Sequence, residues 1–237
     1  MNLTEELKNL LLTHGAGLVG IGNLKEIGEC DYGTGIAVAV PVPGNIVRDL
    51  MEAPTKEYCD LYHTLNHSLN EIVMQGEKFL QERGFAAYAQ TTDRVEIRSD
   101  RRTKLPHKTV ATRAGLGWIG KNGLLVTEAF GPAVRISSLL TNAPLECDGP
   151  VNESMCGECS LCVDHCPAQA LYGTLWEAGM PRERIVEVEK CYQKQKEIMY
   201  EATGIETDLC GKCFAVCRYT QRYLRRNQSF IHSGHME

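Results

Sequence analysis

Cysteine is the residue type that sets this sequence apart, since eleven occur among 237 residues. Four of them form the run Cys156-x2-Cys159-x2-Cys162-x3-Cys166, and Pro167 follows directly. Bacterial ferredoxins use this spacing, with three thiolates each binding one iron of a [4Fe-4S] cube and the fourth reaching a second cluster. A zinc site needs only two Cys-x2-Cys pairs, which leaves the third cysteine and the Cys-Pro pair unexplained. The run therefore predicts iron–sulfur clusters.

A second, incomplete set of cysteines follows the first. The spacing Cys210-x2-Cys213-x3-Cys217 lacks one internal cysteine, and Cys191, which stands alone upstream, can replace it. Pseudo-twofold pairing of such sets joins three cysteines of one run to the last cysteine of the other. We therefore expect two [4Fe-4S] clusters, one held by Cys156, Cys159, Cys162 and Cys217, and one held by Cys166, Cys191, Cys210 and Cys213.

The composition is that of a globular protein in a reducing compartment. The chain is 43% hydrophobic and 23% charged, and 25 Lys and Arg against 30 Asp and Glu give a net charge of −5. The first residues lack the basic and apolar segments of a secretory leader, and no run approaches the roughly 18 apolar residues of a membrane span. We therefore expect a cytoplasmic protein with reduced thiols, no membrane partner and no basic surface for nucleic acid. The cysteines outside the two sets are expected to pack as small apolar side chains: Cys30, Cys59 and Cys147.

The cysteines also divide the chain into modules. Most of them follow residue 146, and Pro144, Gly149 and Pro150 supply chain breakers near that point. We expect a first domain over residues 1–145, a cysteine-rich domain over residues 146–228, and a polar tail over residues 229–237.

The first domain is expected to mix helices with strands, so α+β is the predicted fold class. Apolar residues at helical spacing predict helices over residues 3–14, 57–83 and 108–114. Short apolar runs predict strands over residues 18–21, 36–42 and 85–90, and a strand pair of residues 124–128 with 134–140 around the turn Phe130-Gly131-Pro132.

Two glycine-rich segments resemble nucleotide-binding fingerprints, but neither fits the residues or the order of helix and strand that such a site requires. The segment from Gly15 to Gly20 reads G-x-G-x-x-G, but a helix is expected before it and a strand after it, the reverse of a dinucleotide site. The segment from Gly115 to Asn122 nearly reads as a P-loop, but Asn122 stands where a hydroxyl should reach Mg²⁺. We interpret the first segment as a helix end and the second as a loop whose glycines let the backbone approach a flat or bulky ligand.

Several further segments resemble those of a known protein family and occur in the same order as in that family. They are the run from Arg113 to Leu125, the run from Leu139 to Leu145, the segment from Leu18 to Ile21, the pair Tyr62-His63, and the isolated Cys191. With the eight-cysteine pattern, they resemble the epoxyqueuosine reductase family and its relatives, the reductive dehalogenases. The resemblance implies a nitroreductase-like α+β domain that binds cobalamin, followed by a ferredoxin-like double [4Fe-4S] domain. It also implies that electrons pass through both clusters to cobalamin, whose reduced cobalt attacks an epoxide or a carbon–halogen bond.

The resemblance assigns cobalamin contacts to the strand after the glycine loop, to the neighbouring strand and to the residue beside Cys191. The glycine loop itself is expected to contact cobalamin because its glycines let the backbone approach closely. The chain has no Asp-x-His-x-x-Gly motif, the usual sign of a histidine-ligated corrinoid, so the lower face of the corrin is expected to be free of histidine. The expected contacts are Gly115, Gly117, Trp118, Gly120, Lys121, Asn122, Leu125, Ile136 and Tyr192.

The sequence departs from the tRNA-acting members of this family in two ways. Those members carry a C-terminal helical-repeat region for RNA, whereas this chain ends about twenty residues after Cys217. Their catalytic aspartate would fall on Arg101, with Asp100 one residue away. A substitute proton donor is therefore expected among His107, Tyr62 and Asp100.

These departures favour an iron–sulfur reductase of a small molecule, which uses cobalamin and is supplied by a reduced ferredoxin or flavodoxin-type donor. One alternative is an electron-transfer protein that serves a redox or corrinoid partner without its own substrate. The second alternative is reduction of epoxyqueuosine in tRNA, although the acidic net charge makes nucleic acid an unlikely partner.

Overall fold

The structure is a computed structural model that describes residues 2–27 and 30–233, with side chains through residue 226. The chain forms two compact units, and each unit is built from three chain segments. The first unit comprises Met1–Pro41, His63–Gly117 and Arg135–Asn152, and the second comprises Val42–Tyr62, Trp118–Val134 and Glu153–Glu237. The compact units thus differ from two consecutive halves of the chain, and the division into domains at residue 145 stays a prediction.

A four-stranded sheet forms the centre of the first unit, in the order β1-β2-β6-β3. The strands β1 and β2 are antiparallel, with Leu18 opposite Ala39, and β3 and β6 are antiparallel, with Ala87 opposite Thr141. The strand bounds are Leu18–Asn23 for β1, Thr34–Pro41 for β2, Ala87–Ala89 for β3 and Val134–Thr141 for β6. The mixed helix and strand composition predicted from the sequence is confirmed.

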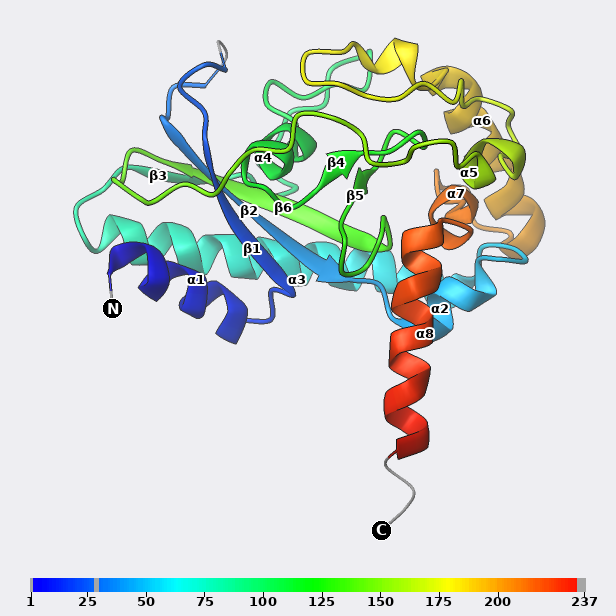
Figure 1. Cartoon of the computed structure of the whole chain (residues 1–237), viewed down its shortest axis with the longest axis horizontal. Coiled ribbons are helices and arrows are strands. Elements are labelled where there is room, and N and C mark those ends of the chain that lie inside the picture. The colour runs from blue at the N-terminus through cyan, green and yellow to red at the C-terminus, as the bar shows by residue number, and fades with distance from the viewer. Residues whose placement is uncertain (1, 28–29, 234–237) are drawn as a thin grey trace. The chain divides into compact units, whose positions relative to one another are not determined.

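Helices cover both faces of this sheet (Figure 1). Their bounds are Leu3–Thr13 for α1, Lys56–Gln81 for α3, which begins in the second unit, and His107–Arg113 for α4. The main core lies on the face covered by α1 and α3, where Leu7, Leu69 and Ile72 pack with Ile21 and Leu139 of the sheet. Because side chains alternate along a strand, the neighbours of Ile21 point to the other face, toward α4.

Glycines on β1 let the end of α4 lie close to the sheet. A Cβ atom on Gly20 would lie 2.2 Å from the carbonyl oxygen of Ala114, and one on Gly22 would lie 2.6 Å from the carbonyl carbon of Arg113. Gly15 adopts a φ of 104° directly after α1, and β1 follows. The segment from Gly15 to Gly20 is therefore a helix end and a close-packed strand, as expected, and not a dinucleotide fingerprint.

We expect Gly22→Ala to lower the stability of the first unit by about 1–3 kcal/mol, the usual range for overpacking. The added methyl group meets backbone atoms of Arg113 and Ala114, which cannot move aside as a flexible side chain can. The matched control is Gly149→Ala, because a Cβ atom there has no neighbour within 4 Å. Thermal unfolding of both variants tests this, and equal melting temperatures would contradict the packing argument.

The second unit consists of short elements around a two-stranded sheet of β4 and β5. Aromatic contacts join these elements, with ring centroids 4.9 Å apart for Trp118 and Tyr219 and 5.2 Å apart for Phe130 and Tyr223. The element bounds are Trp118–Ile119 for β4, Leu125–Val126 for β5, Gly44–Asp49 for α2, Leu161–Asp164 for α5, Arg182–Arg184 for a 3-10 helix, Val188–Thr203 for α6, Lys212–Ala215 for α7 and Arg218–Ser233 for α8.

The predicted pairing of residues 124–128 with 134–140 is wrong. Leu125 lies opposite Ile119 in the β4–β5 pair, whereas β6 joins the large sheet next to β2 and β3. The turn at Phe130-Gly131-Pro132 exists, and it brings only Thr127 and Gly131 opposite each other. The predicted polar tail begins inside α8, which continues to Ser233, and residues 234–237 lie outside the described residues.

The order of elements also excludes a nucleotide P-loop at Gly115 to Asn122. The helix α4 precedes this segment, the strand β4 lies within it and the strand β5 follows it, whereas a P-loop connects a strand to a helix. Within the described residues, no helix is both long enough and apolar enough to cross a membrane.

Candidate iron–sulfur centres and neighbouring residues

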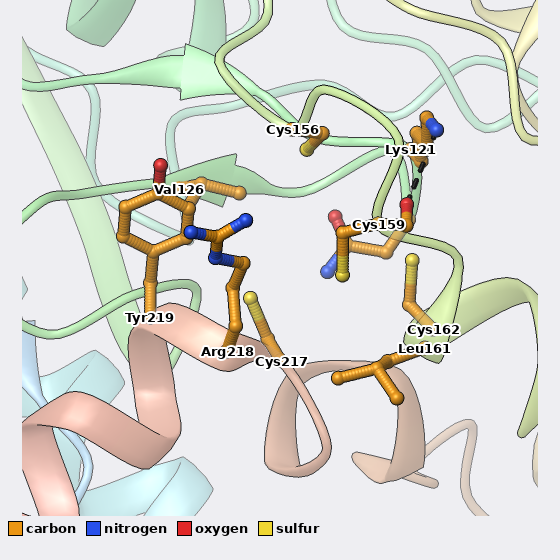
Figure 2. Close-up of a pocket in the computed structure, with 10 residues that line it drawn as sticks. Lys121, Val126, Cys156, Cys159, Leu161, Cys162, Cys217, Arg218 and Tyr219 are labelled. Carbon is orange, nitrogen blue, oxygen red and sulfur yellow. Dashed lines mark hydrogen bonds between the residues drawn. The ribbon is translucent and has the colours of Figure 1, made fainter.

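The first predicted cysteine set lies around one cavity of the second unit. Cys156 and Cys159 come from the loop before α5, Cys162 lies on α5, and Cys217 connects α7 to α8. All four residues line the same cavity. Figure 2 shows their side chains around a common space, with Cys156 at the top, Cys217 at the lower left, and Cys159 and Cys162 on the right.

Burial and the neighbouring thiols raise the pKa values of two thiols in this set, Cys162 and Cys217. Burial raises the pKa of Cys162 to about 12, with further contributions from Cys156, Cys217 and Cys159. Burial also raises the pKa of Cys217, although the backbone N–H groups of Tyr219 and Thr220 at the start of α8 oppose the increase. Cys162 and Cys217 would therefore hold protons in the absence of metal, so binding of iron must release those protons.

The second predicted set is a neighbouring group of thiols in the same unit, since Cys162 of the first set also contributes to raising the pKa of Cys213. Burial raises the pKa of Cys191, on α6, to about 11, and Cys166 and Cys210 contribute. Burial raises the pKa of Cys213, on α7, well above its usual value, with Cys210 as the largest thiol contribution. Two donors also reach sulfur: the N–H of Ala170 lies 3.5 Å from Cys166 Sγ, and Gln195 Nε2 lies 3.3 Å from Cys191 Sγ.

The structure thus brings the eight cysteines together in two groups of four that match the two expected ligand sets. Within the described residues, no three His, Cys, Asp or Glu side chains converge on a position for one metal ion. Such convergence is not needed for a cube, because each of its irons takes its own cysteine. The ligand assignment itself stays a prediction.

The glycine loop places a lysine beside the first cysteine group. Lys121 is only 8% exposed, and its Nζ donates to the carbonyl oxygen of Cys159 at 3.1 Å. The loop is held by Asn122, whose Oδ1 accepts from the N–H of Leu124 at 3.1 Å. A Cβ atom on Gly120 would lie 2.7 Å from Asn122 Oδ1. Sequence reasoning did not find the contact between the loop and Cys159, since the two residues are 38 positions apart.

The residues expected to contact cobalamin differ in how far they are open to a ligand. Gly115 is exposed, and Ile136 and Tyr192 are half-buried. The others are enclosed by the chain itself: Gly117, Trp118, Gly120, Lys121, Asn122 and Leu125. Gly115, Gly117 and Ile136 belong to the first unit and the remaining residues to the second. Trp118 Nε1 is buried without a hydrogen-bond partner, which identifies one donor that the chain leaves unused.

The three candidate proton donors occupy different settings. His107 is the first residue of α4 and is half-buried, with Nδ1 2.8 Å from Ser138 Oγ. Burial, followed by the charge of Arg135, lowers the pKa of His107 to about 4. Asp100 is exposed and accepts from the N–H of Arg102 at 3.0 Å. Tyr62 lies on α3 in the second unit, whereas His107 and Asp100 belong to the first.

Cysteines outside the two groups match the expectation of small buried side chains only in part. Cys59 is buried, as expected, and burial raises its pKa. Cys30 is half-buried and donates to the carbonyl oxygen of Tyr32. Cys147 is exposed, so the expectation is wrong there, because the chain after β6 runs along the surface.

Comparison with known proteins agrees with the cysteine geometry. The 4Fe-4S binding domain family matches residues 150–172, which contain the whole first cysteine run. An epoxyqueuosine reductase from Lactococcus garvieae is 32% identical over 168 residues, which cover 68% of this chain and 42% of the relative.

Solved structures share the fold over nearly the whole chain. An epoxyqueuosine reductase bound to an epoxyqueuosine-modified tRNA-Tyr stem loop superposes with a TM-score of 0.61 at 20% identity, covering 92% of this chain and 65% of that one. A reductive dehalogenase whose structure suggests a mechanism for B12-dependent dehalogenation gives 0.68 at 17% identity, covering 96% of this chain and 33% of that one. This chain thus spans less than half of the curated relative from Lactococcus garvieae. The chain belongs to the epoxyqueuosine reductase-like family and carries a 4Fe-4S binding domain.

Proposed function

We propose that this protein is an iron–sulfur reductase that passes electrons through two [4Fe-4S] clusters to a bound cobalamin. The observation that carries the proposal is the grouping of eight cysteines into two sets of four within one compact unit. Thiolates are the ligands that iron–sulfur clusters take, and no other donor set on the described residues has this number and spacing. A nitroreductase-like first domain and a ferredoxin-like second domain belong to the same proposal.

Cobalamin, when bound, supplies a cobalt centre that can be reduced and can attack a strained or activated bond. On the first unit, the exposed backbone of Gly115 and the half-buried side chain of Ile136 suit contact with a flat ring system. On the second unit, the half-buried ring of Tyr192 has the same property. The buried residues of the glycine loop, Trp118 among them, would not contact cobalamin directly but would hold the loop in position.

The substrate is proposed to be epoxyqueuosine in tRNA, which was the second alternative from the sequence. The names of the relatives favour it over a small molecule, and one structural neighbour was solved with a modified tRNA stem loop. The chain is acidic overall, but four exposed arginines lie on the first turns of α8: Arg218, Arg222, Arg225 and Arg226. The acidic net charge therefore does not exclude a nucleic acid partner, because a local basic face is sufficient to contact phosphates.

Anaerobic reconstitution followed by titration with cob(II)alamin tests the cofactor assignment. We expect about eight iron per chain, from two four-iron cubes, and a change of the cobalamin spectrum to a base-off form. Stoichiometric zinc without iron would contradict the cluster assignment. Two clusters without cobalamin binding at micromolar protein would favour the electron-transfer alternative. Assays on modified tRNA and on the free epoxyqueuosine nucleoside separate the two substrate classes.

A further inference from the structure

Lys121 is a buried cation that no carboxylate balances among the residues that the structure describes. It is 8% exposed, and its one described contact is the hydrogen bond from Nζ to the carbonyl oxygen of Cys159. No ion pair joins it to any acidic side chain in the part of the chain that the structure describes. A carbonyl satisfies one of the three donors of an ammonium group and supplies no opposite charge. Burying a charge without a counter-ion is strongly unfavourable, so this position requires a nearby anion.

The cavity beside Lys121 identifies that anion. Besides the four cysteines, it is lined by neutral residues such as Val126, Leu161 and Tyr219, and by a second cation, Arg218. Figure 2 shows the Arg218 guanidinium extending into the same space as the sulfur atoms. Without the thiolates, the cavity therefore holds only positive charge. A [4Fe-4S] cube with four thiolates has a net negative charge and becomes more negative on reduction.

We propose that Lys121 is the internal counter-cation of the centre bound by Cys156, Cys159, Cys162 and Cys217, and that it raises the reduction potential of that centre above that of its neighbour. The inference rests on the proposed two-cluster function. A fixed cation stabilises the reduced cluster more than the oxidised one, since the reduced cluster carries the larger negative charge. Burial strengthens this effect, because little water screens the interaction.

At the second centre, the described hydrogen bonds to sulfur come from neutral donors, the N–H of Ala170 at 3.5 Å from Cys166 Sγ and the Gln195 amide at 3.3 Å from Cys191 Sγ. Lys212, which lies between Cys210 and Cys213 in the sequence, is only half-buried and donates to the carbonyl oxygen of Met51. Among the described residues, Lys121 is the only lysine or arginine that is buried, so the second centre has no buried cation of this kind. One electron supplied by a reduced ferredoxin or flavodoxin-type donor would then move from the Cys191 centre, which is oxidised, to the Cys156 centre, which is reduced. No bond forms or breaks in this step.

An anaerobic redox titration followed by electron paramagnetic resonance tests the proposal on the reconstituted protein. We expect Lys121→Met to shift the reduction equilibrium of one centre at least tenfold toward the oxidised form, about 59 mV for a one-electron couple, and to leave the other centre unchanged. Lys121→Arg keeps the charge and should keep the potential. Arg218→Met is the matched control, because Arg218 lines the same cavity but is exposed, and its shift should be smaller.

The Cys191→Ala variant, which is expected to retain the Cys156 centre alone, identifies which potential moves. An unchanged potential in Lys121→Met, or an equal shift of both centres, overturns the proposal. If Lys121→Met does not assemble the Cys156 centre, Lys121→Gln replaces it, since the amide still donates without a charge. If neither Lys121→Met nor Lys121→Gln assembles the Cys156 centre but Lys121→Arg does, the role of Lys121 as counter-cation is supported. If Lys121→Arg also fails to assemble the centre, the proposal is overturned. Wild-type protein without any cluster would instead refute the proposed function, and iron analysis recognises that case first.

Discussion

Replacement of Cys191 by alanine should remove one iron–sulfur centre and abolish turnover, while the other centre remains. Cys191 stands alone on α6, yet its thiol lies with Cys166 and Cys210 rather than with Cys156, Cys159 and Cys162. We therefore expect the iron content to fall from about eight to about four per chain, because one cube loses a ligand and the other loses none. Iron analysis, with the visible and paramagnetic resonance spectra of the reduced protein, measures the loss.

The matched variant is Cys217→Ala, which should remove the other centre and leave the Cys191 centre intact. Cys59→Ala is the control, because Cys59 is buried but belongs to neither cysteine group. This variant should keep both centres. Loss of all iron in Cys191→Ala would mean that the two centres assemble together. Full retention of iron there would show that the isolated cysteine is not a ligand and that the second set must be completed by another residue.

The cysteine spacing predicted which thiols lie near one another, whereas hydrophobic periodicity did not predict how the strands pair. The order of elements in the first unit follows from local signals, and the helix predicted over residues 57–83 is α3, Lys56–Gln81. Partners across a sheet depend on contacts distant in sequence, which is why β6 was paired with the wrong neighbour. The same limitation applies to Lys121: the loop was recognised from its own residues, but its contact with Cys159 depends on how distant segments of the second unit pack.

The surroundings of His107 could not be predicted from the neighbouring sequence either, because they come from distant segments. Ser138 comes from β6, and Gln90, whose Nε2 donates to Ser138 Oγ at 2.7 Å, follows β3. Arg135, which lowers the pKa of His107 together with burial, also comes from β6. Burial and Arg135 thus lower the pKa of His107, and Ser138, held by Gln90, contacts its Nδ1, whereas the sequence presents this histidine only as the start of a short helix.

Turnover is expected to fall at least ~100-fold in His107→Gln, within the usual range for losing a group that assists a developing oxyanion. The sequence suggested a protonated histidine as the acid, but a pKa of about 4 makes the ring neutral at pH 7. When the Ser138 hydroxyl donates to Nδ1, the neutral ring carries its own hydrogen on Nε2. A neutral imidazole fixed in this way can still stabilise a leaving oxygen by hydrogen bonding.

The dependence of turnover on pH distinguishes this role from that of a charged acid. With a pKa near 4, the neutral form of His107 predominates above about pH 5, so its contribution should stay constant between about pH 5.5 and 8. A protonated donor would instead lose activity as the pH rises through its pKa. Ser138→Ala should lose part of the same activity, because the ring hydrogen of His107 is then no longer fixed on Nε2. Both variants should keep cobalamin and both clusters. Asp100→Asn is the control, since Asp100 is exposed and bonded to its own loop. Unchanged turnover in His107→Gln beside a large loss in Asp100→Asn would assign the donor to Asp100, next to the position that the family aspartate would occupy.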